Sequence, residues 1–244
     1  MDFSEKSVLV IGGSSGIGRA TSVYLSNLGA RVFATGRTEA HIEETKALAP
    51  LIEFALIDLP KDAEKLVKWV SEVVETLDGI VFSQGIIFTE PFETFRDYEL
   101  EMMWKVNVEV SFKILRDLLP LFKNGGSVVL ISSIDAFFKE RAPSAGYALT
   151  KSAIIGLTNS LSSELGKYKI RVNSVSPGLI RTNMTEDFFT DEFELERKQF
   201  LQRVPLGREG NPDEVARLIA FLLSDDASYI SGDNIFIDGG YHTG

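Results

Sequence analysis

Short apolar runs rich in β-branched residues alternate along the chain with longer segments whose apolar positions recur every three or four residues. The short runs predict seven strands, at Ser7–Ile11, Arg31–Thr35, Ile52–Ile57, Gly79–Ser83, Gly126–Ser132, Ile170–Ser176 and Asn234–Ile237. The longer segments predict helices at Ile17–Leu28, Glu39–Leu48, Asp62–Leu77, Phe95–Leu119, Ser144–Leu165 and Pro212–Leu223. The strand runs are apolar throughout, as in strands covered on both faces. This alternation predicts an α/β protein with a doubly wound, parallel, seven-stranded sheet between two helical layers.

The scarce residue types exclude several chemistries. The chain has no cysteine, which excludes disulfides, a thiol nucleophile and thiolate metal centres. Its two histidines, His41 and His242, leave little material for a Ser–His–Asp triad or a three-histidine metal centre, and we predict no metal site. The net charge of −10 repels nucleic acid and anionic lipid, so neither is expected as a partner.

The chain is expected to act as one cytoplasmic domain over residues 1–244. Composition does not shift along its length, and no linker or repeat separates two parts. Its beginning lacks a basic segment followed by an apolar run, as a secretory signal would require. No stretch approaches the roughly 18 apolar residues of a membrane span.

A glycine loop follows the first predicted strand and opens the first predicted helix. It reads Gly12-Gly13-Ser14-Ser15-Gly16-Ile17-Gly18. In a parallel sheet, ligands bind beyond the carboxyl ends of the strands, and a glycine loop lets backbone amides approach a pyrophosphate. The other interpretation is an ordinary glycine-rich turn between strand and helix. We favour a dinucleotide site of Rossmann type, with Gly12, Ser14, Ser15, Gly16, Ile17 and Gly18 as cofactor-binding residues.

The spacing Gly-x-x-x-Gly-x-Gly resembles that of the short-chain dehydrogenase/reductase family, in its short single-domain branch. The similarity extends from Ser7 to Gly240. One departure is Ile11, where the family usually has threonine, so the hydrogen bonds of that hydroxyl must come from elsewhere in the turn.

The end of the second predicted strand bears on the choice of cofactor. A carboxylate here would accept the ribose 2′-hydroxyl of NAD, but this chain has Gly36 followed by Arg37. A guanidinium can bind the 2′-phosphate of NADP, although Arg37 could also be a solvated arginine in a turn. The resemblance favours NADP(H), with Ser14 and Arg37 contacting the phosphate. Asp58-Leu59 follows the third strand, where Asp58 would either bind the adenine amino group or make a turn.

A tyrosine and a lysine one helical turn apart form the sharpest catalytic signal, Tyr147-Ala148-Leu149-Thr150-Lys151. Residues i and i+4 share a helix face. An ammonium about 4 Å away would lower the pKa of the phenol by up to about three units, and desolvation would oppose that shift. Alone, such a pair is common on protein surfaces. Here Asn107 and Ser133 precede it in an order and context that match the family's catalytic tetrad.

The resemblance implies a role for each of these four residues. Ser133 and Tyr147 would hydrogen-bond a carbonyl oxygen that receives hydride from the nicotinamide, and Tyr147 would transfer the proton as general acid/base. Lys151 would lower the pKa of the phenol and hold the nicotinamide ribose. Asn107 would bend its helix and position a water. The separation of Ser133 and Tyr147 is slightly longer than usual, which indicates an insertion between Ile134 and Gly146.

The remaining cofactor contacts are also carried by family motifs. Pro177, Gly178, Ile180 and Thr182 follow the sixth strand, where the family closes over the nicotinamide, and Tyr147 and Lys151 also face the cofactor. After the fourth strand the family typically shows Asn-Asn-Ala-Gly, whereas this chain reads Phe82-Ser83-Gln84-Gly85. Gly85 is expected to keep its place beside the ribose, but the asparagine that braces the sheet is replaced. Cofactor binding is therefore expected to be altered and activity retained.

The substrate is the least determined part of the prediction. The segment 183–203 is expected to cover the pocket as a mobile lid; it contains Phe188, Phe189, Phe193 and Phe200. These rings, with Phe137 and Phe138, would either line an apolar pocket for a hydrophobic or cyclic ketone or pack against the sheet. The chain broadly resembles 3-ketoacyl carrier-protein reductases, but their basic docking positions correspond here to Asn124 and Tyr168, with lysines adjacent.

Two other classes remain as alternatives. A catalytically silent dinucleotide sensor would have lost Tyr147 or Lys151, and both are present. A nucleotide-sugar epimerase would need a larger substrate domain and another glycine spacing. The long apolar helices Phe95–Leu119 and Ser144–Leu165 fit the homodimer or homotetramer that is usual in the family. The sequence thus predicts an NADP(H)-dependent carbonyl reductase acting on a small molecule, with a carrier-protein-linked ketoacyl reductase as the alternative.

Overall fold

All strands of the structure belong to one parallel sheet. The computed structural model describes residues 1–138 and 145–243. Within them the strands are β1 (Ser7–Ile11), β2 (Arg31–Gly36), β3 (Glu53–Leu56), β4 (Gly79–Phe82), β5 (Gly126–Ile131), β6 (Ile170–Pro177) and β7 (Asn234–Ile237). They pair in the order β3-β2-β1-β4-β5-β6-β7, each parallel to its neighbours. The strand order reverses between β1 and β4, which confirms the doubly wound sheet and puts its ligand-binding edge beyond these strands.

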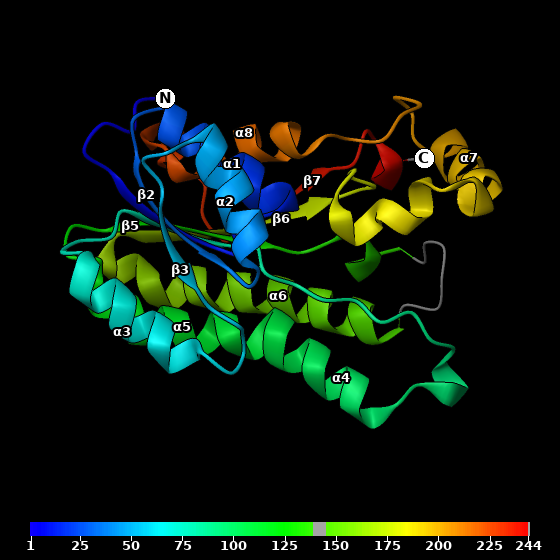
Figure 1. The fold of residues 1–244 in the computed structure, drawn as a ribbon, viewed down its shortest axis with the longest axis horizontal. Coiled ribbons are helices and arrows are strands. Elements are labelled where there is room, and N and C mark those ends of the chain that lie inside the picture. Colours follow the sequence, from blue (N-terminus) through cyan, green and yellow to red (C-terminus); the bar gives the residue numbers. More distant parts are fainter. Residues whose placement is uncertain (139–144, 244) are drawn as a thin grey trace.

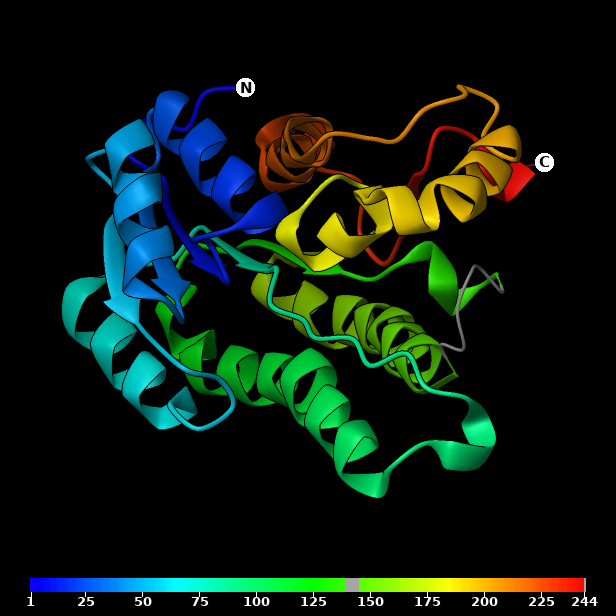
Figure 2. The same ribbon diagram turned by 45° about the vertical axis from the view of Figure 1, so that its right-hand side comes forward.

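Helices cover both faces of the sheet. They are α1 (Gly16–Asn27), α2 (Glu39–Leu48), α3 (Ala63–Val73), α4 (Asp97–Trp104), α5 (Val110–Leu118), α6 (Ala145–Leu165), α7 (Glu194–Gln202) and α8 (Pro212–Leu223). Figures 1 and 2 show α1, α2 and α8 on one side, and α3, α5 and α6 on the other. None of the helices in the described part of the chain is long and apolar enough to cross a membrane.

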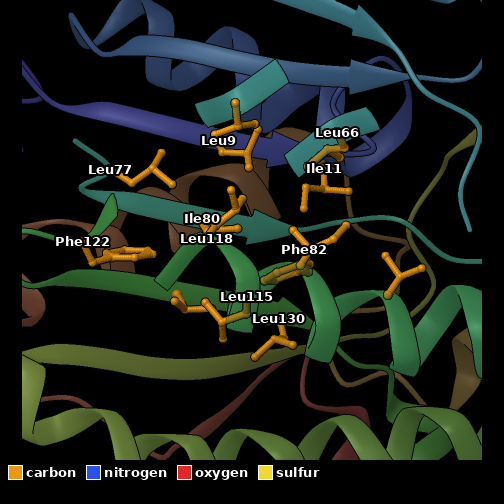
Figure 3. Close-up of a cluster of buried hydrophobic side chains, with 14 of the residues drawn as sticks. Leu9, Ile11, Leu66, Leu77, Ile80, Phe82, Leu115, Leu118, Phe122 and Leu130 are labelled. Carbon is orange, nitrogen blue, oxygen red and sulfur yellow. The ribbon is translucent and has the colours of Figure 1, made fainter. Parts of the chain in front are cut away.

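Two apolar layers follow from the alternation of side chains along each strand. On β1, Leu9 and Ile11 point toward α3, α5 and α6, in the cluster drawn in Figure 3. Val8 and Val10 point the other way, toward α1 and α8. Since successive side chains of a strand lie on opposite faces, an apolar run buries residues in both layers. The central strands are buried as predicted.

The edge strand and one helix differ from their predicted form. β3 is confined to Glu53–Leu56, and both of its end residues are exposed because β3 has a neighbour on one side only. The predicted helix Asp62–Leu77 ends at Val73. The chain leaves the helix there because Leu77 is fully buried in the core and its N–H bonds the Leu121 carbonyl.

The long predicted helix over Phe95–Leu119 contains an irregular turn. α4 and α5 are joined by a π-helical turn over Lys105–Glu109, with Asn107 in its middle. A π turn widens the helix by one residue and leaves the regular hydrogen-bond ladder, and such turns are frequent at functional sites. The other long helix, α6, is described from Ala145, so its predicted start at Ser144 lies outside the described residues.

Candidate active site

Two glycines of the loop, Gly12 and Gly18, lie where the surrounding backbone leaves no space for a Cβ. A Cβ on Gly12, whose φ is +78°, would lie 2.9 Å from the Gln84 nitrogen. A Cβ on Gly18 would lie 2.1 Å from the Gly12 carbonyl oxygen. The N-cap residue of α1, Ser15, makes no side-chain capping bond, so the first amides of the helix have no side-chain acceptor. These amides and the tight loop fit the pyrophosphate of a dinucleotide.

A hydroxyl from the neighbouring strand compensates for the isoleucine at position 11. The Gly12 N–H donates to Thr35 Oγ1 at 3.0 Å, and Thr35 is buried on β2. The loop therefore obtains a threonine acceptor from β2. The sequence indicated that such a bond had to come from elsewhere, but not from which residue.

The ends of β2 and of the glycine loop are in close contact. A Cβ on Gly36 would lie 2.5 Å from Ser14 Oγ, so a carboxylate side chain at position 36 does not fit while Ser14 keeps its place. Arg19 Nε donates to the Ser14 carbonyl and to Thr45 Oγ1, both at 3.0 Å, which links the loop to α2. Arg37 is exposed directly after Gly36.

Asp58 lies exposed after β3, followed by the half-buried Leu59. The Asp58 N–H donates to Asp62 Oδ2 at 2.9 Å. The carboxylate that closes this turn thus belongs to Asp62, and the Asp58 carboxylate is not needed for it. The binding of the adenine amino group by Asp58 stays a prediction.

Tyr147 and Lys151 lie one turn apart at the start of α6, and both are buried. Lys151 Nζ is 5.5 Å from the centroid of the Tyr147 ring and donates to the Ile131 carbonyl at 2.8 Å. Burial lowers the pKa of Lys151 to about 8, and the carboxylate of Asp135 acts in the opposite direction. Lys151 therefore loses its proton at a pH closer to neutral than an ordinary lysine does.

Asn107 connects the π turn to the segment after β4. Its Oδ1 accepts from the Ile86 N–H at 2.9 Å, and its Nδ2 donates to the Ile86 carbonyl at 3.0 Å. Nδ2 also donates to Thr150 Oγ1 at 3.0 Å. A Cβ on Gly85 would lie 3.6 Å from both Asn107 Oδ1 and Lys151 Nζ. The structure thus brings Asn107, Gly85, Tyr147 and Lys151 together.

Ser133 lies where β5 meets α6. Its hydroxyl caps the short 3-10 helix Ile134–Ala136 by accepting from the Asp135 N–H at 3.1 Å, and it donates to Asp135 Oδ2 at 2.9 Å. The preceding residue, Ser132, donates from Oγ to the Lys151 carbonyl at 2.9 Å, which ties the strand end to α6. Of the expected insertion between Ile134 and Gly146, residues 139–144 lie outside the described residues.

Gln84 forms a contact that sequence reasoning did not foresee. Its Nε2 donates to the Val106 carbonyl of the π turn at 3.3 Å and to Ser111 Oγ at 2.9 Å. Where the family has alanine, this chain therefore has an amide that joins the β4 end to α5. Only the departure from the Asn-Asn-Ala-Gly motif could have drawn attention to it.

The segment after β6 returns to the glycine loop. A Cβ on Gly16 would lie 3.3 Å from Thr182 Cβ, so these two predicted cofactor residues are neighbours. The Thr182 N–H donates to Thr185 Oγ1 at 3.0 Å. Pro177 ends β6, Gly178 packs closely on Asp238, and Ile180 is buried. Thr182 therefore lies beside the glycine loop.

The lid segment, residues 183–203, consists of the 3-10 helices Asn183–Phe189 and Asp191–Phe193 followed by α7. Phe188 and Phe200 are buried in an apolar cluster that also contains Tyr241, whose ring stacks on Phe200 with centroids 4.9 Å apart. For these two rings, the packing interpretation is favoured over a pocket lining. Phe193 and Phe137 are partly exposed.

Together, the fold and the site define a dinucleotide-binding oxidoreductase of the α/β class, and comparisons with known proteins agree. A family model described as enoyl-(acyl carrier protein) reductase matches residues 12–242. The 3-oxoacyl-[acyl-carrier-protein] reductase FabG of Thermotoga maritima is 32% identical over 249 residues, which cover 98% of this chain and 99% of that protein. The levodione reductase of Leifsonia aquatica is 33% identical over 252 residues, which cover 98% of this chain and 94% of that protein.

A solved structure of the same shape contains a cofactor. The Pseudomonas aeruginosa RhlG/NADP active-site complex superposes with a TM-score of 0.92 at 28% identity, covering 99% of this chain and 98% of that chain. The chain belongs to the short-chain dehydrogenase/reductase family, which binds a nicotinamide dinucleotide. The family resemblance seen in the sequence is confirmed.

Proposed function

We propose that this protein is an NADP(H)-dependent oxidoreductase that interconverts a ketone and a secondary alcohol, acting as a carbonyl reductase on an apolar or cyclic substrate. The observation that carries the proposal is the buried Tyr147–Lys151 pair, held beside Gly85 by Asn107. Relatives named as a levodione reductase and as 3-oxoacyl reductases support carbonyl chemistry. In this proposal the chain is one domain, and residues 183–203 close over the substrate.

In this proposal, Ser133, Tyr147 and Lys151 each have a different role in the reaction. When bound, the nicotinamide supplies the hydride in reduction or accepts it in oxidation. When substrate binds, the Ser133 hydroxyl turns its proton from Asp135 Oδ2 to the substrate oxygen, and Tyr147 donates a second hydrogen bond to that oxygen, where negative charge develops. Tyr147 then gives up its proton, and the positive charge of Lys151 stabilises the phenolate that remains. The lowered pKa of Lys151, about 8, suits a group that exchanges protons near neutral pH.

Replacing the phenol tests this assignment directly. We expect Tyr147→Phe to lower kcat at least 100-fold, because a general acid contributes about 10² to 10⁴ in rate. The Kd for NADPH should stay within a few-fold, since the hydroxyl is the only group removed. Tyr24→Phe, a half-buried tyrosine on α1, is the matched control. Ketone reduction by Tyr147→Phe at the rate of the parent would overturn the assignment.

The preference for NADP(H) is supported by three features. Position 36 has no space for a carboxylate, Arg37 is an exposed guanidinium beside it, and a structural neighbour is an NADP complex. We expect Arg37→Ala to reduce the NADPH-to-NADH preference in kcat/KM about tenfold or more, since a hydrogen bond to a charged group contributes about 1.5–3 kcal/mol. The control is Arg31→Ala, at the opposite end of β2, where Arg31 pairs with Glu53. Equal kcat/KM for both cofactors in the parent would contradict the preference.

A carrier-protein-linked 3-ketoacyl reductase is the second candidate, favoured by the likeness to FabG. Asn124 and Tyr168 stand where the resemblance expects basic docking residues. A panel of free ketones compared with a 3-ketoacyl carrier protein separates the two functions. We expect bulky apolar ketones to be reduced faster than short polar sugars. A kcat/KM for the acylated carrier protein that exceeds every free ketone would favour the second candidate.

The helices α4 and α6 supply the surface for the homodimer or homotetramer that we propose. A hollow of about 410 Å³ lies between them, lined in part by Trp104 and Leu149, which are both partly exposed. Tyr98 and Met102 add exposed apolar surface on α4. Light scattering should give two or four times the mass of one chain, and Trp104→Glu should lower it. A monomeric parent protein would contradict the proposal.

A further inference from the structure

Thr150 is buried between the two proposed catalytic residues of α6. Its side chain is 0% exposed, and its hydroxyl donates to the Tyr147 carbonyl at 2.8 Å. The same oxygen accepts from Asn107 Nδ2 at 3.0 Å, across 43 residues of sequence. One hydroxyl therefore joins the first turn of the catalytic helix to the π turn between α4 and α5.

The Asn107 amide is fully engaged because Thr150 is one of its partners. Its other Nδ2 proton goes to the Ile86 carbonyl, and its oxygen accepts from the Ile86 N–H. Without the Thr150 oxygen, one amide proton would be left in a buried place without an acceptor, which is unfavourable. Asn107 would then have to turn toward another acceptor, and this would release the Ile86 backbone.

The position of the Ile86 backbone affects the candidate site because Ile86 directly follows Gly85. Gly85 forms the surface against which Lys151 Nζ lies, as a Cβ there would be 3.6 Å from it. A turn of Asn107 would thus change the position of the loop that faces the Lys151 ammonium. Thr150 acts on this loop through Asn107 alone, since its own hydroxyl touches neither Gly85 nor Ile86 by hydrogen bond.

A second threonine on α6 shows what is particular about Thr150. Thr158 is 1% exposed, and its hydroxyl donates to the Ile154 carbonyl at 2.8 Å. Such bonds to the preceding turn are common for threonine in helices. In the described part of the chain, Thr158 accepts no side-chain hydrogen bond, whereas Thr150 accepts one from another element.

We infer that Thr150 is a positioning residue: its hydroxyl holds Asn107 in the orientation that fixes the Gly85–Ile86 loop beside Lys151. The effect on turnover rests on the proposed function. The effect on the loop does not, because it concerns hydrogen bonds within this chain.

Hydrogen–deuterium exchange of the cofactor-free protein tests the inference without any assay of activity. Thr150→Val keeps the shape of the side chain and removes the acceptor. We expect the Ile86 amide, which bonds Asn107 Oδ1, to exchange at least tenfold faster in this variant. Thr150→Ser should exchange as the parent does, and so should the matched control Thr158→Val. Thr150→Ala removes the same acceptor with a smaller side chain, and it replaces Thr150→Val if that variant does not fold.

Kinetics with NADPH and a reactive ketone complete the test. Thr150→Val should lower kcat about tenfold with KM for the ketone within threefold, and Thr150→Ser should restore kcat. Unchanged exchange at Ile86 in both Thr150→Val and Thr150→Ala would overturn the inference. Equal loss of kcat in Thr150→Val and Thr158→Val would also overturn it. If the parent reduces no ketone while Ile86 exchange responds as expected, the proposed function fails and the inference stands.

Discussion

On one side of the candidate site, α6 and the π turn hold polar side chains through hydrogen bonds that are buried from solvent. On the other side, aromatic rings of the lid segment pack on their neighbours: Phe200 stacks on Tyr241, and the Arg181 guanidinium lies 4.1 Å from the centroid of Phe189. Hydrogen bonds fix direction, whereas apolar contacts tolerate changes of shape. We propose that the chemistry belongs to the first side and the choice of substrate to the second.

The largest effect is expected on the hydrogen-bonded side. Ser133→Ala removes a donor to the substrate oxygen, and kcat should fall about 10² to 10³-fold, as for the loss of one oxyanion donor. The variant should fold, because among the described residues the hydroxyl hydrogen-bonds only Asp135. Steady-state kinetics with NADPH and a ketone measure the fall in kcat. Ser132→Ala, which removes a helix tie but no such donor, is the comparison. A larger loss in Ser132→Ala than in Ser133→Ala would contradict the division of roles.

On the lid side, stability should change more than chemistry. Phe200→Ala removes a buried ring from the apolar cluster, and the free energy of unfolding should fall by about 3–5 kcal/mol. For ketones that still bind, kcat should stay within a few-fold and KM should change. Thermal unfolding and the ketone panel measure both quantities. Leu195→Ala, an exposed residue of α7, serves as control. A fall in kcat as large as that of Ser133→Ala would show that the lid takes part in the chemistry.

A smaller effect is expected from pH. The pKa of Lys151, lowered to about 8 by burial, means that the ammonium loses its charge as pH rises through that value. Reduction needs the charged lysine and the protonated phenol, so kcat/KM should fall about tenfold per pH unit above the pKa. The Asp135 carboxylate raises this pKa, so Asp135→Asn should move the fall to lower pH. A flat profile up to pH 10 would contradict this account.

The same lysine affects stability with the opposite sign. Between about pH 8 and the ordinary lysine value, the unfolded chain keeps a proton that the folded protein has lost. The contribution of Lys151 to the free energy of unfolding therefore increases with pH across that window. Comparing Lys151→Met with the parent by chemical denaturation at pH 7.5 and 9.5 isolates this contribution.

The sequence predicted the elements of the sheet closely because apolar periodicity is a local property. It also predicted that Asn107, Tyr147 and Lys151 meet, through the resemblance to the family. It did not predict the π turn, since helical periodicity continues through Lys105–Glu109. Thr35, Gln84 and Thr150 were likewise not foreseen as supports of the site. Their partners lie 22 to 43 residues away, and only the folded chain shows which buried polar groups are paired.

The assignment of carbonyl reduction is tested most directly by the position of deuterium in the product. The protein is given a cyclic enone and NADPH deuterated at both C4 positions. The enone offers a carbonyl carbon and a β-carbon to the same hydride. We predict an allylic alcohol with deuterium on the carbinol carbon, formed by the parent and not by Tyr147→Phe. Deuterium on the β-carbon of a saturated ketone, the outcome for an enoyl reductase, would contradict the assignment of carbonyl reduction to Ser133, Tyr147 and Lys151.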